Sequence, residues 1–388
     1  MSTLKTGNIT HPSSTGTAIT LDASDNVTIN GPTNFNSNAV SGIASINGGQ
    51  IGGSRNLVIN GAMTVQQRGT QTNQTGGYTA CDRWQFAENG SSVITTTQDT
   101  NVPVGKGFGS SLKIEVTNAS GTPTAANYAL LRTKFEGQNL QQLAKGTSEA
   151  KDLTLSFWVS SPKTGTHIVE LFDNDNSRQV SRAYTISTAN TWQYVSVVYP
   201  ADTTGSFNNA NSASLQLAFW LMAGSDNSSG TLAENWQAYN APDRAVGQVN
   251  VMDSTSNNFY LTGVQLEVGS QATPFEHRLY ADELQRCLRY YQVSGTIKGY
   301  PMVRYENTGN GKAYSNWRLV PEMRTSPSVS FSGTFITSTG YSGTPTAGDI
   351  TARQFRLLSA SSVNPNDNLW VETNSVTESQ GIISDAEL

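Results

Sequence analysis

The sequence predicts an all-β protein, and three observations support this. The composition is polar but weakly charged: 14% of the 388 residues are charged, and 35 glycines suit frequent tight turns. Many short segments alternate apolar and polar side chains, as half-buried strands do. The 14 Tyr, 13 Phe and 7 Trp supply too much large apolar surface for a disordered chain. Because 388 residues exceed one ordinary sandwich, we expect two or three folded units.

We expect residues 1 to 53 to form the first unit, an N-terminal β-fibre segment. They are rich in Thr, Asn, Ser and Gly, and short alternations at residues 18 to 21 and 27 to 30 are flanked by turn residues. Strands this short bury no core within one chain. Three copies wrapped together bury one face each, which predicts a homotrimer. A flexible leader is the alternative.

Residues 54 to 275 predict one large antiparallel jelly-roll sandwich. Residues 56 to 61 open it as a strand that ends in an Asn-Gly turn. Residues 259 to 268 close it, and their alternation shifts at Gly263, which indicates a bulge. A short helical stretch is expected at residues 137 to 146. The other strands are expected at residues 112 to 116, 128 to 135, 153 to 161, 167 to 172, 191 to 199 and 215 to 224.

Residues 276 to 293 predict a short linker helix. Leu284, Leu288 and Tyr291 fall at i, i+4 and i+7, with Cys287 beside them. This apolar stripe either docks on the sandwich or lines a three-fold axis, and the sequence leaves both open.

Residues 294 to 388 predict a smaller C-terminal β-sandwich. The alternation of apolar and polar residues is again the reason. Its strands are expected at residues 328 to 335, 352 to 360 and 369 to 374.

Three stretches resemble phage tail-fibre and related virion proteins. NLVINGAMTVQQRG (56 to 69), followed by YTACDRWQF (78 to 86), is similar to the opening of tail-fibre sandwiches. LSFWVSSPKTGTHIVEL (155 to 171) is similar to the central hairpin of carbohydrate-binding modules with the same architecture. GQVNVMDSTSNNFYLTGVQLEVGSQATPFEHR (247 to 278), with DELQRCLRYY, is similar to their closing strand and exit helix. The resemblance covers residues 54 to 292.

The resemblance implies a homotrimeric tail fibre of a bacteriophage virion, made in the host cytoplasm. Residues 7 to 31 and the ending ISDAEL also resemble such fibres. Residues 1 to 53 then attach to other tail or baseplate proteins, and the C-terminal part is the tip that binds a host-surface glycan or protein. The alternative is a non-binding connector or a decoration fibre of the head or neck.

The resemblance also bears on metal binding. Carbohydrate-binding modules of this type often place an Asp in the closing strand, near a structural calcium ion. The corresponding positions here are Thr262 and Gly263. Calcium prefers six or more oxygen ligands, usually including carboxylates, so we expect no metal and no cofactor. The alternative is a calcium site built from other carboxylates, for which the candidates are Asp82, Asp173, Asp175 and Asp253.

Charge and composition exclude further classes of partner. The 24 Lys and Arg against 29 Asp and Glu give a net charge of −5, so no basic field attracts nucleic acid. MSTLKTGNIT has no apolar core of signal-peptide length, and no apolar run is long enough for membrane insertion. Cys81 and Cys287 fit no zinc or redox spacing. We read them as free buried thiols, with a disulfide between them as the alternative.

Catalysis has little support in the sequence. His11, His167 and His277 fall in three different segments, and no G-x-S-x-G, H-E-x-x-H or Walker motif occurs. A depolymerase needs paired carboxylates in a cleft. Asp173 and Asp175 lie in a turn, where we expect them to face water and cap backbone amides. The sequence therefore predicts a protein that is not an enzyme.

Sugar recognition requires an aromatic face, with amide and acid groups for the hydroxyls. Trp236 and Tyr239 are candidates because they lie in a long polar insertion between strands. The alternative is that Trp236 folds back over the open end of the sandwich. Further aromatic residues crowd a Gly- and Asn-rich stretch of the C-terminal unit, where they suit receptor contact or a subunit interface equally. These are Tyr300, Tyr305, Tyr314 and Trp317.

Overall fold

The computed structural model describes residues 8–10, 17–21, 27–29, 54–294, 314–332, 335–337, 344, 346–358, 371–373 and 381–388. The chain divides into two compact units, Met1–Ile46 and Asn47–Leu388. Its sheets are antiparallel, and strands far outnumber helices, so the all-β class is confirmed. Over the described ranges, no helix has the length and apolar character needed to cross a membrane.

The N-terminal unit contains one small antiparallel sheet. It is built from β1 (Asn8–Thr10), β2 (Thr17–Leu21) and β3 (Val27–Ile29), in that order. The two short strands that the sequence predicts here are present as β2 and β3. Most of the predicted segment from 1 to 53 lies outside the described residues, and its role in trimer formation stays a prediction.

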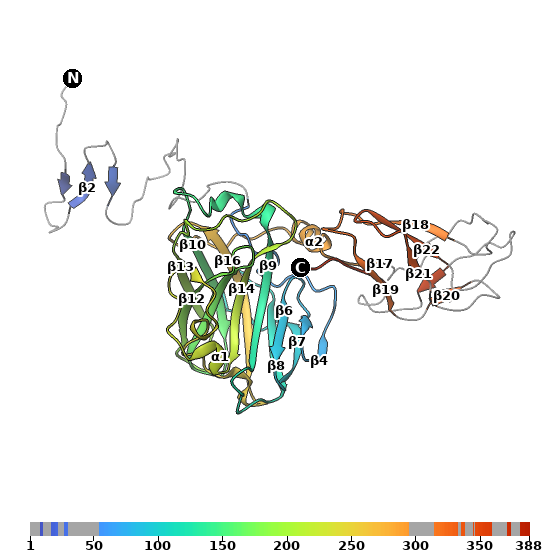
Figure 1. Ribbon diagram of the computed structural model, residues 1–388, viewed down its shortest axis with the longest axis horizontal. Helices are drawn as coiled ribbons and strands as arrows, with labels where there is room; N and C mark the ends of the chain where they lie inside the picture. Colours follow the sequence, from blue (N-terminus) through green and yellow to red (C-terminus); the bar gives the residue numbers. More distant parts are fainter. Residues whose placement is uncertain are drawn as a thin grey trace, which may run out of the picture. The chain divides into compact units, whose positions relative to one another are not determined.

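Two sheets face each other in the second unit and form the expected jelly-roll sandwich (Figure 1). The six-stranded sheet has the order β13-β10-β16-β8-β7-β4, and the seven-stranded sheet has the order β15-β12-β11-β14-β9-β6-β5. The six are β4 (Gln71–Gln74), β7 (Val93–Asp99), β8 (Ser111–Asn118), β10 (Leu153–Ser160), β13 (Gln193–Tyr199) and β16 (Asn258–Val268). The seven are β5 (Gly77–Tyr78), β6 (Gln85–Asn89), β9 (Tyr128–Glu136), β11 (Gly165–Asp173), β12 (Arg178–Ile186), β14 (Ala213–Ala223) and β15 (Gln237–Ala238).

The strands expected from residue 112 onward in the sandwich are all present, with ends that differ by at most two residues. The predicted helical stretch near residue 140 consists of two short 3-10 turns, Gly137–Asn139 and Gln141–Leu143. A one-turn helix α1 (Ser225–Ser228) follows β14. The strands β4 to β7, β12 and β15 were not expected from the sequence. β4 and β7 are rich in Thr and Gln, which dilutes the apolar alternation, and β5 and β15 are only two residues long.

Aromatic side chains fill much of the space between the two sheets. Phe157 of β10 meets Phe219 of β14 edge to face, with ring centroids 5.0 Å apart, and Tyr184 of β12 at 5.1 Å. Trp84 lies against Phe219 with centroids 6.1 Å apart. Trp84, Phe157 and Phe219 are completely buried. Since each such ring removes a large apolar area from water, this layer is a main source of stability.

The closing strand β16 carries the bulge that the sequence predicts at Gly263. Its pairing with β10 shifts register between Gln265 and Thr262. Gly263 has a φ of +61°, and a β-carbon there would lie 2.6 Å from Cζ of Phe108. The left-handed backbone and the close ring both require glycine.

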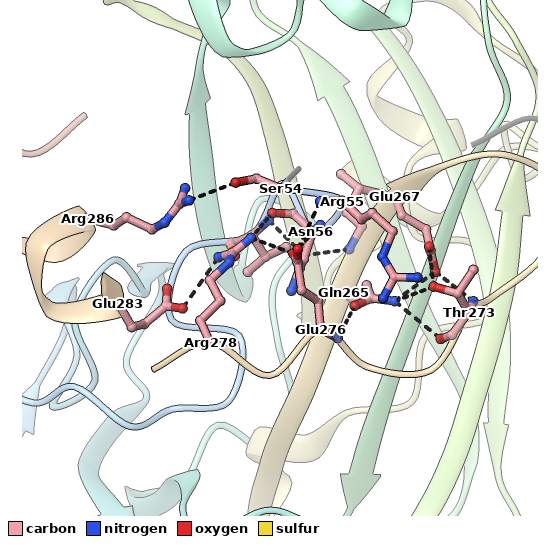
Figure 2. Close-up of polar contacts among 12 residues, drawn as sticks. Ser54, Arg55, Asn56, Gln265, Glu267, Thr273, Glu276, Arg278, Glu283 and Arg286 are labelled. Atoms are coloured by element: carbon pink, nitrogen blue, oxygen red, sulfur yellow. Dashed lines mark hydrogen bonds and ion pairs between the residues drawn. The ribbon is translucent and has the colours of Figure 1, made fainter. Parts of the chain in front are cut away.

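The segment before the first strand lies along β16 and is held there by backbone hydrogen bonds and by the side chain of one asparagine (Figure 2). Asn56, 3% exposed, donates from Nδ2 to the carbonyl of Val264 at 3.0 Å. Its Oδ1 accepts from the N–H groups of Val58 at 2.9 Å and Leu266 at 3.1 Å. The structure forms no strand at residues 56 to 61, so that prediction is wrong. Two backbone hydrogen bonds, from Leu57 to Leu266 and from Val264 to Gly61, join the segment to β16, and the Asn56 side chain supplies the bonds between them.

The segment after β16 closes on the same residues (Figure 2). The Glu276 carboxylate accepts from the N–H groups of Arg55 at 3.2 Å and Asn56 at 2.8 Å. Arg278 donates to the carbonyl of Val58 at 3.0 Å and pairs with Glu276 at 3.0 Å. The first and last segments of the sandwich consequently lie side by side.

The linker helix α2 (Tyr280–Leu288) is shorter than the expected range of 276 to 293. It buries Glu283 and Cys287, whereas Leu284 and Leu288 are partly exposed. The prediction of the buried face is therefore wrong: the residues that face inward come one position earlier in the sequence than the predicted Leu284 and Leu288.

A polar contact explains why this face turns inward. The Glu283 carboxylate accepts from the N–H of Asn60 and pairs with Arg278 at 3.4 Å. Helix α2 thus docks on the sandwich through a carboxylate as well as through apolar atoms. Cys81 and Cys287 are both free and buried, as expected, and burial raises the pKa of each thiol.

The described strands beyond α2 form the smaller C-terminal β-sandwich. Tyr291, expected in the helix, is the first residue of β17. Phe355 and Leu357 of one sheet share a buried core with Ile382 of the other. The sheets are β17 (Tyr291–Ser294), β24 (Gly381–Asp385) and β19 (Ser328–Ser332); β18 (Tyr314–Arg318), β22 (Gln354–Leu358) and β21 (Thr346–Gly348); and the pair β20 (Phe335–Thr337) and β23 (Val371–Thr373).

A buried ion pair joins this smaller sandwich to the large one. The side chains of Arg83 and Glu387 are 2% and 3% exposed and form the pair. The Arg83 guanidinium lies 3.5 Å from the ring centroid of Tyr290. Arg68 also pairs with Glu387, at 3.3 Å, and lies 3.6 Å from the ring centroid of Tyr291. Burial raises the pKa of Glu387, and the two arginines counteract this only in part.

Candidate functional site

The structure describes only some of the aromatic residues that the sequence proposes as C-terminal contacts. Tyr300 and Tyr305 lie outside the described residues, and of Tyr314 only the place in β18 is described. Trp317 is partly buried and stacks on Phe355, with ring centroids 6.4 Å apart, at the core of the smaller sandwich. A receptor-binding role for these residues stays a prediction.

Trp236 folds back over the rim of the large sandwich. Its Nε1 donates to the carbonyl of Pro200 at 2.9 Å, and its ring packs against the core. The ring centroid lies 5.3 Å from the Lys145 ammonium, which pairs with Asp173 at 2.6 Å and Asp202 at 3.0 Å. Trp236 therefore covers a buried ion cluster, and a role in sugar binding stays a prediction for it as well.

The two aspartates considered for catalysis occupy different environments. Asp173 is completely buried, so the expectation that it faces water is wrong: β11 ends by pointing it at Lys145. It does cap backbone amides, as expected, accepting from Asp175 at 2.9 Å and Asn176 at 3.0 Å. Asp175 is exposed and accepts from the side-chain amide of Asn208 at 2.7 Å. Both carboxylates thus stabilise the turn that follows β11.

Tyr239 lies at the edge of the seven-stranded sheet, against Phe172 of β11. The two rings meet edge to face, with centroids 5.8 Å apart and an interplanar angle of 88°. Tyr239 is 49% exposed and Phe172 is partly exposed. The N–H of Tyr239 donates to the carbonyl of Ser177 at 2.8 Å, which fixes the backbone. The pair, here called the aromatic step, offers apolar ring surface to solvent.

The aromatic step belongs to the outer face of the sheet. Val169 and Leu171 of β11 point into the core of the sandwich. Because side chains alternate along a strand, Glu170 and Phe172 point to the opposite side. Residues that pair directly across neighbouring strands point to the same side of a sheet, so the partners of Glu170 and Phe172 also lie on the outer face.

A row of polar side chains continues from the aromatic step across this face. Phe172 pairs with Gln216 of β14, and Gln216 pairs with Lys134 of β9. Arg132 donates to Gln216 at 3.1 Å and to Gln85 of β6 at 2.7 Å. With neighbouring strands about 4.8 Å apart, the row from β11 to β6 spans about 14 Å.

A buried ion pair holds the aromatic step in place. Glu170 is completely buried and accepts two hydrogen bonds from Arg244, each of 2.8 Å, and one from Nε1 of Trp220 at 3.2 Å. The Arg244 guanidinium lies 5.5 Å from the ring centroid of Phe172 and 5.7 Å from that of Tyr239. Both rings therefore pack on a cation whose position is fixed by two hydrogen bonds.

The far end of the row meets the last residues of the chain as given. Lys134 Nζ and the Tyr78 hydroxyl both donate to the carbonyl oxygen of Leu388, each at 2.8 Å. Burial, with Arg132 nearby, lowers the pKa of Lys134 to about 8. Burial raises the pKa of Tyr78. At neutral pH both groups therefore keep the protons with which they bind Leu388.

This arrangement has the chemistry of a sugar-binding surface. An aromatic ring stacks on the apolar face of a sugar, while amide and guanidinium groups bind its hydroxyls. Tyr239 was recognisable from the sequence because it lies in a polar insertion. Four further residues were missed because each comes from a different strand and nothing local marks it: Gln85, Arg132, Phe172 and Gln216.

The residues considered for calcium are engaged by the protein itself. The Thr262 hydroxyl donates to the carbonyl of Ser110 at 2.7 Å. Asp82 is buried and accepts from the N–H of Gln67 at 2.9 Å. In the part of the chain that the structure describes, no three His, Cys, Asp or Glu side chains gather as metal ligands would.

A groove of about 750 Å³ lies beside the segment that leaves β16. Ser54, Glu276, His277, Arg278 and Arg286 are among its lining residues. Arg286 donates to the Ser54 hydroxyl at 2.8 Å, and Glu276 pairs with Arg278 at 3.0 Å (Figure 2). These polar groups are already paired with other groups of the chain, so we assign the groove a structural role and no ligand.

No protein-family model matches the sequence, and no curated protein matches it. Among solved structures, the enzymatically active domain of tailspike protein 4 of bacteriophage CBA120 is similar to 55% of this chain, at 14% identity and a TM-score of 0.31. The matched region is 21% of the tailspike chain. A carbohydrate-binding module of family 4 matches 54% of this chain over 97% of its own, at 14% identity and a TM-score of 0.28.

A family 11 module from Clostridium thermocellum, in complex with a mixed-linked tetrasaccharide, matches 49% of this chain over 91% of its own length. Its identity is 10% and its TM-score 0.26. At these identities and TM-scores, none of the three structures places the chain in a family.

Proposed function

We propose that the chain is a non-enzymatic subunit of a phage fibre that binds a neutral or weakly charged glycan on the outer face of its large sandwich. The observation that carries the binding function is the aromatic step of Phe172 and Tyr239. Polar side chains continue from this step across three neighbouring strands. The resemblance of residues 54 to 292 to tail-fibre sandwiches supports the fibre assignment.

The geometry fits an extended ligand. A sugar ring on the aromatic step would leave its next units over Arg132 and Gln85, while Gln216, which is 5% exposed, accepts from Arg132 beneath them. Arg132 is held by bonds of 2.7 Å to Gln85 and 3.1 Å to Gln216. Such a preorganised surface loses little side-chain freedom on binding, which favours affinity.

Binding to a glycan array tests this function. Tyr239→Ala removes half of the aromatic step, and we expect binding about fivefold weaker than for the natural chain, or weaker still, since ring stacking of this kind contributes about 1 kcal/mol or more. Tyr194→Ala is the matched control, because Tyr194 is 50% exposed but lies on β13 of the other sheet. Equal loss in both variants, or none in Tyr239→Ala, contradicts the assignment.

The virion role of the chain is part of the same proposal. Residues 1 to 53 attach the fibre to tail or baseplate proteins, three copies assemble together, and residues 294 to 388 form a tip with a second set of aromatic contacts. Three copies per fibre multiply a weak single-site affinity. Sedimentation at nanomolar concentration should give a trimer; a compact monomer contradicts it.

The tip contributes separately from the sandwich. Host adsorption should weaken in Trp317→Ala or Tyr305→Ala if these residues contact the receptor. If neither these variants nor Tyr239→Ala alters adsorption, the chain is the non-binding connector that the sequence leaves as the alternative. Release of reducing ends from host envelope material would instead show an enzyme.

A further inference from the structure

A second groove lies between the two sandwiches, remote from the aromatic step. It has a volume of about 830 Å³ and runs between residues 68 to 78, which include β4 and β5, and the sheet of β17, β24 and β19. Most of its lining side chains carry hydroxyl or amide groups. They include Thr70, Gln71, Thr72, Asn73, Thr75 and Ser332.

The floor of the groove holds an arginine with an unused donor. The side chain of Arg68 is 7% exposed, and its Nη2 lies 3.3 Å from Glu387 and 3.6 Å from Asp385. Its Nη1 lies 3.8 Å from Asp82, too far for a hydrogen bond, and makes none. Nη1 is itself buried, so its missing acceptor costs free energy and leaves the guanidinium only partly paired.

Two aromatic rings stand beside the same guanidinium. Its carbon lies 3.6 Å from the ring centroid of Tyr291 and 4.8 Å from that of Tyr78. Both tyrosines line the groove. Arg68 is therefore held by rings and carboxylates, and a ligand does not have to order it.

The charges around Arg68 select against an anion. Three carboxylates, those of Asp82, Asp385 and Glu387, lie within 4 Å of its guanidinium nitrogens. A phosphate or a uronic acid would meet this negative charge, and Arg68 is already paired with it. A neutral hydroxyl instead donates to Asp385, whose side chain is 36% exposed and lines the groove.

We propose that this groove is a second saccharide site, which takes a neutral sugar through hydroxyl contacts to Asp385 and the hydroxyl and amide groups of residues 70 to 75. It goes beyond the proposed function, which places the glycan on the outer face of the sheet. Among the described residues named for the two sites, Tyr78 is the one that borders both, so one site can be lost without the other.

Isothermal titration of the full chain with neutral tetrasaccharides of glucose, mannose and galactose tests the proposal. The natural chain should bind two equivalents of at least one of them per subunit. Thr75→Val combined with Ser332→Ala removes two groove hydroxyls without touching the ion cluster, and should weaken one class of sites at least tenfold. Thr185→Val, exposed on β12, is the matched control and should leave both classes intact.

Asp385→Asn gives a second reading, because it removes an acceptor while keeping the shape. It should weaken the same class of sites as the double variant while the chain stays folded, which a thermal unfolding midpoint above the titration temperature checks. Tyr239→Ala should leave this class untouched. The groove and the outer face therefore fail independently in the titration.

Three outcomes would overturn the proposal. One is full stoichiometry and affinity in the double variant. Another is a single class of sites that Tyr239→Ala abolishes. The third is tighter groove binding of inorganic phosphate or of a tetrasaccharide of glucuronic acid than of any neutral tetrasaccharide.

Discussion

Gly61 and Val264 touch through their backbones: a β-carbon on Gly61 would stand 2.1 Å from the carbonyl oxygen of Val264. The N–H of Val264 donates to the carbonyl of Gly61 at 2.9 Å. The opening segment of the sandwich therefore meets the closing strand β16 at a distance that only a residue without a side chain allows. This contact, and the polar groups around it, yield the first two predictions.

Gly61→Ala should destabilise the large sandwich. The added methyl group meets backbone, which cannot rotate away, so the two segments must separate; we expect a loss of about 3 kcal/mol in the free energy of unfolding. Urea unfolding measures it. Gly109→Ala is the control, because nothing lies within 4 Å of a β-carbon there, and it should change stability by less than about 0.5 kcal/mol. Equal effects in the two variants contradict the contact.

Asn56→Ala should cost a similar amount for a different reason. It leaves the buried N–H groups of Val58 and Leu266 without the Oδ1 acceptor and the carbonyl of Val264 without a donor. Unpaired buried groups cost about 1–3 kcal/mol each, so we expect about 3 kcal/mol in total after relaxation. Asn118→Ala removes an exposed bond of 2.7 Å to Ser91 and should cost far less in the same unfolding experiment. A small effect at Asn56 would show that water replaces its bonds.

The acid stability of the sandwich should depend on His167. The ring is completely buried, stacks on Tyr184 with centroids 5.4 Å apart, and its Nε2 lies 3.0 Å from the carbonyl of Lys163. Burial lowers its pKa from 6.5 to about 4. Between these values the unfolded chain binds a proton that the folded chain does not, so stability falls as the pH decreases through this window.

This pH effect can be separated from others by substitution. From pH 7.5 to 4.5 the histidine should cost the natural chain about 2.5 kcal/mol of unfolding free energy. In His167→Leu this part of the decline should vanish, whatever the variant's stability at pH 7.5. Parallel pH profiles for the two proteins would show that the ring is protonated in the folded state at pH 4.5.

Breaking the buried pair of Arg83 and Glu387 should loosen the smaller sandwich from the large one. Arg83→Met leaves a buried carboxylate with Arg68 alone, and we expect a cost of about 3–5 kcal/mol at pH 8. Burial already raises the pKa of Glu387, and loss of Arg83 raises it further. The folded variant then holds a proton that the unfolded chain releases as the pH rises above 4.5, so the cost grows between pH 4 and 8.

A double variant provides the control for this pair. Arg83→Met combined with Glu387→Gln removes the unpaired charge and should recover part of the loss, which a double-mutant cycle measures. Hydrogen exchange of β24 should report the loosening in the single variant first. Additive losses in the cycle would show that the two side chains do not interact.

The sequence predicted those parts of the fold whose signals are local. The shift of alternation at Gly263 predicted the bulge of β16, because a glycine and a break in pattern are both visible in one short segment. Strands such as β4 and β7 were missed, since their Thr and Gln residues hide the alternation. The buried face of α2 was misjudged because Glu283 turns inward to meet Asn60 and Arg278, which come from other segments.

The candidate site shows the same division. Tyr239 could be chosen from the sequence because an exposed aromatic in a polar insertion is unusual. Its partner Phe172, and Arg132 beside them, could not be chosen, because their proximity depends on the pairing of β11, β14 and β9. Long-range register brings these residues together, and no pattern within one strand specifies it.

The adjacency of Arg55 and Glu276 has a consequence for how the large sandwich can be reused. Both ends of this module leave from one spot, so it could be spliced into a surface loop of an unrelated host protein without stretching that host apart. A force applied to both ends would break the hydrogen bonds of Asn56 and Glu276 before it disrupted the aromatic core. The large sandwich is thus a module whose two ends are held together by its own hydrogen bonds.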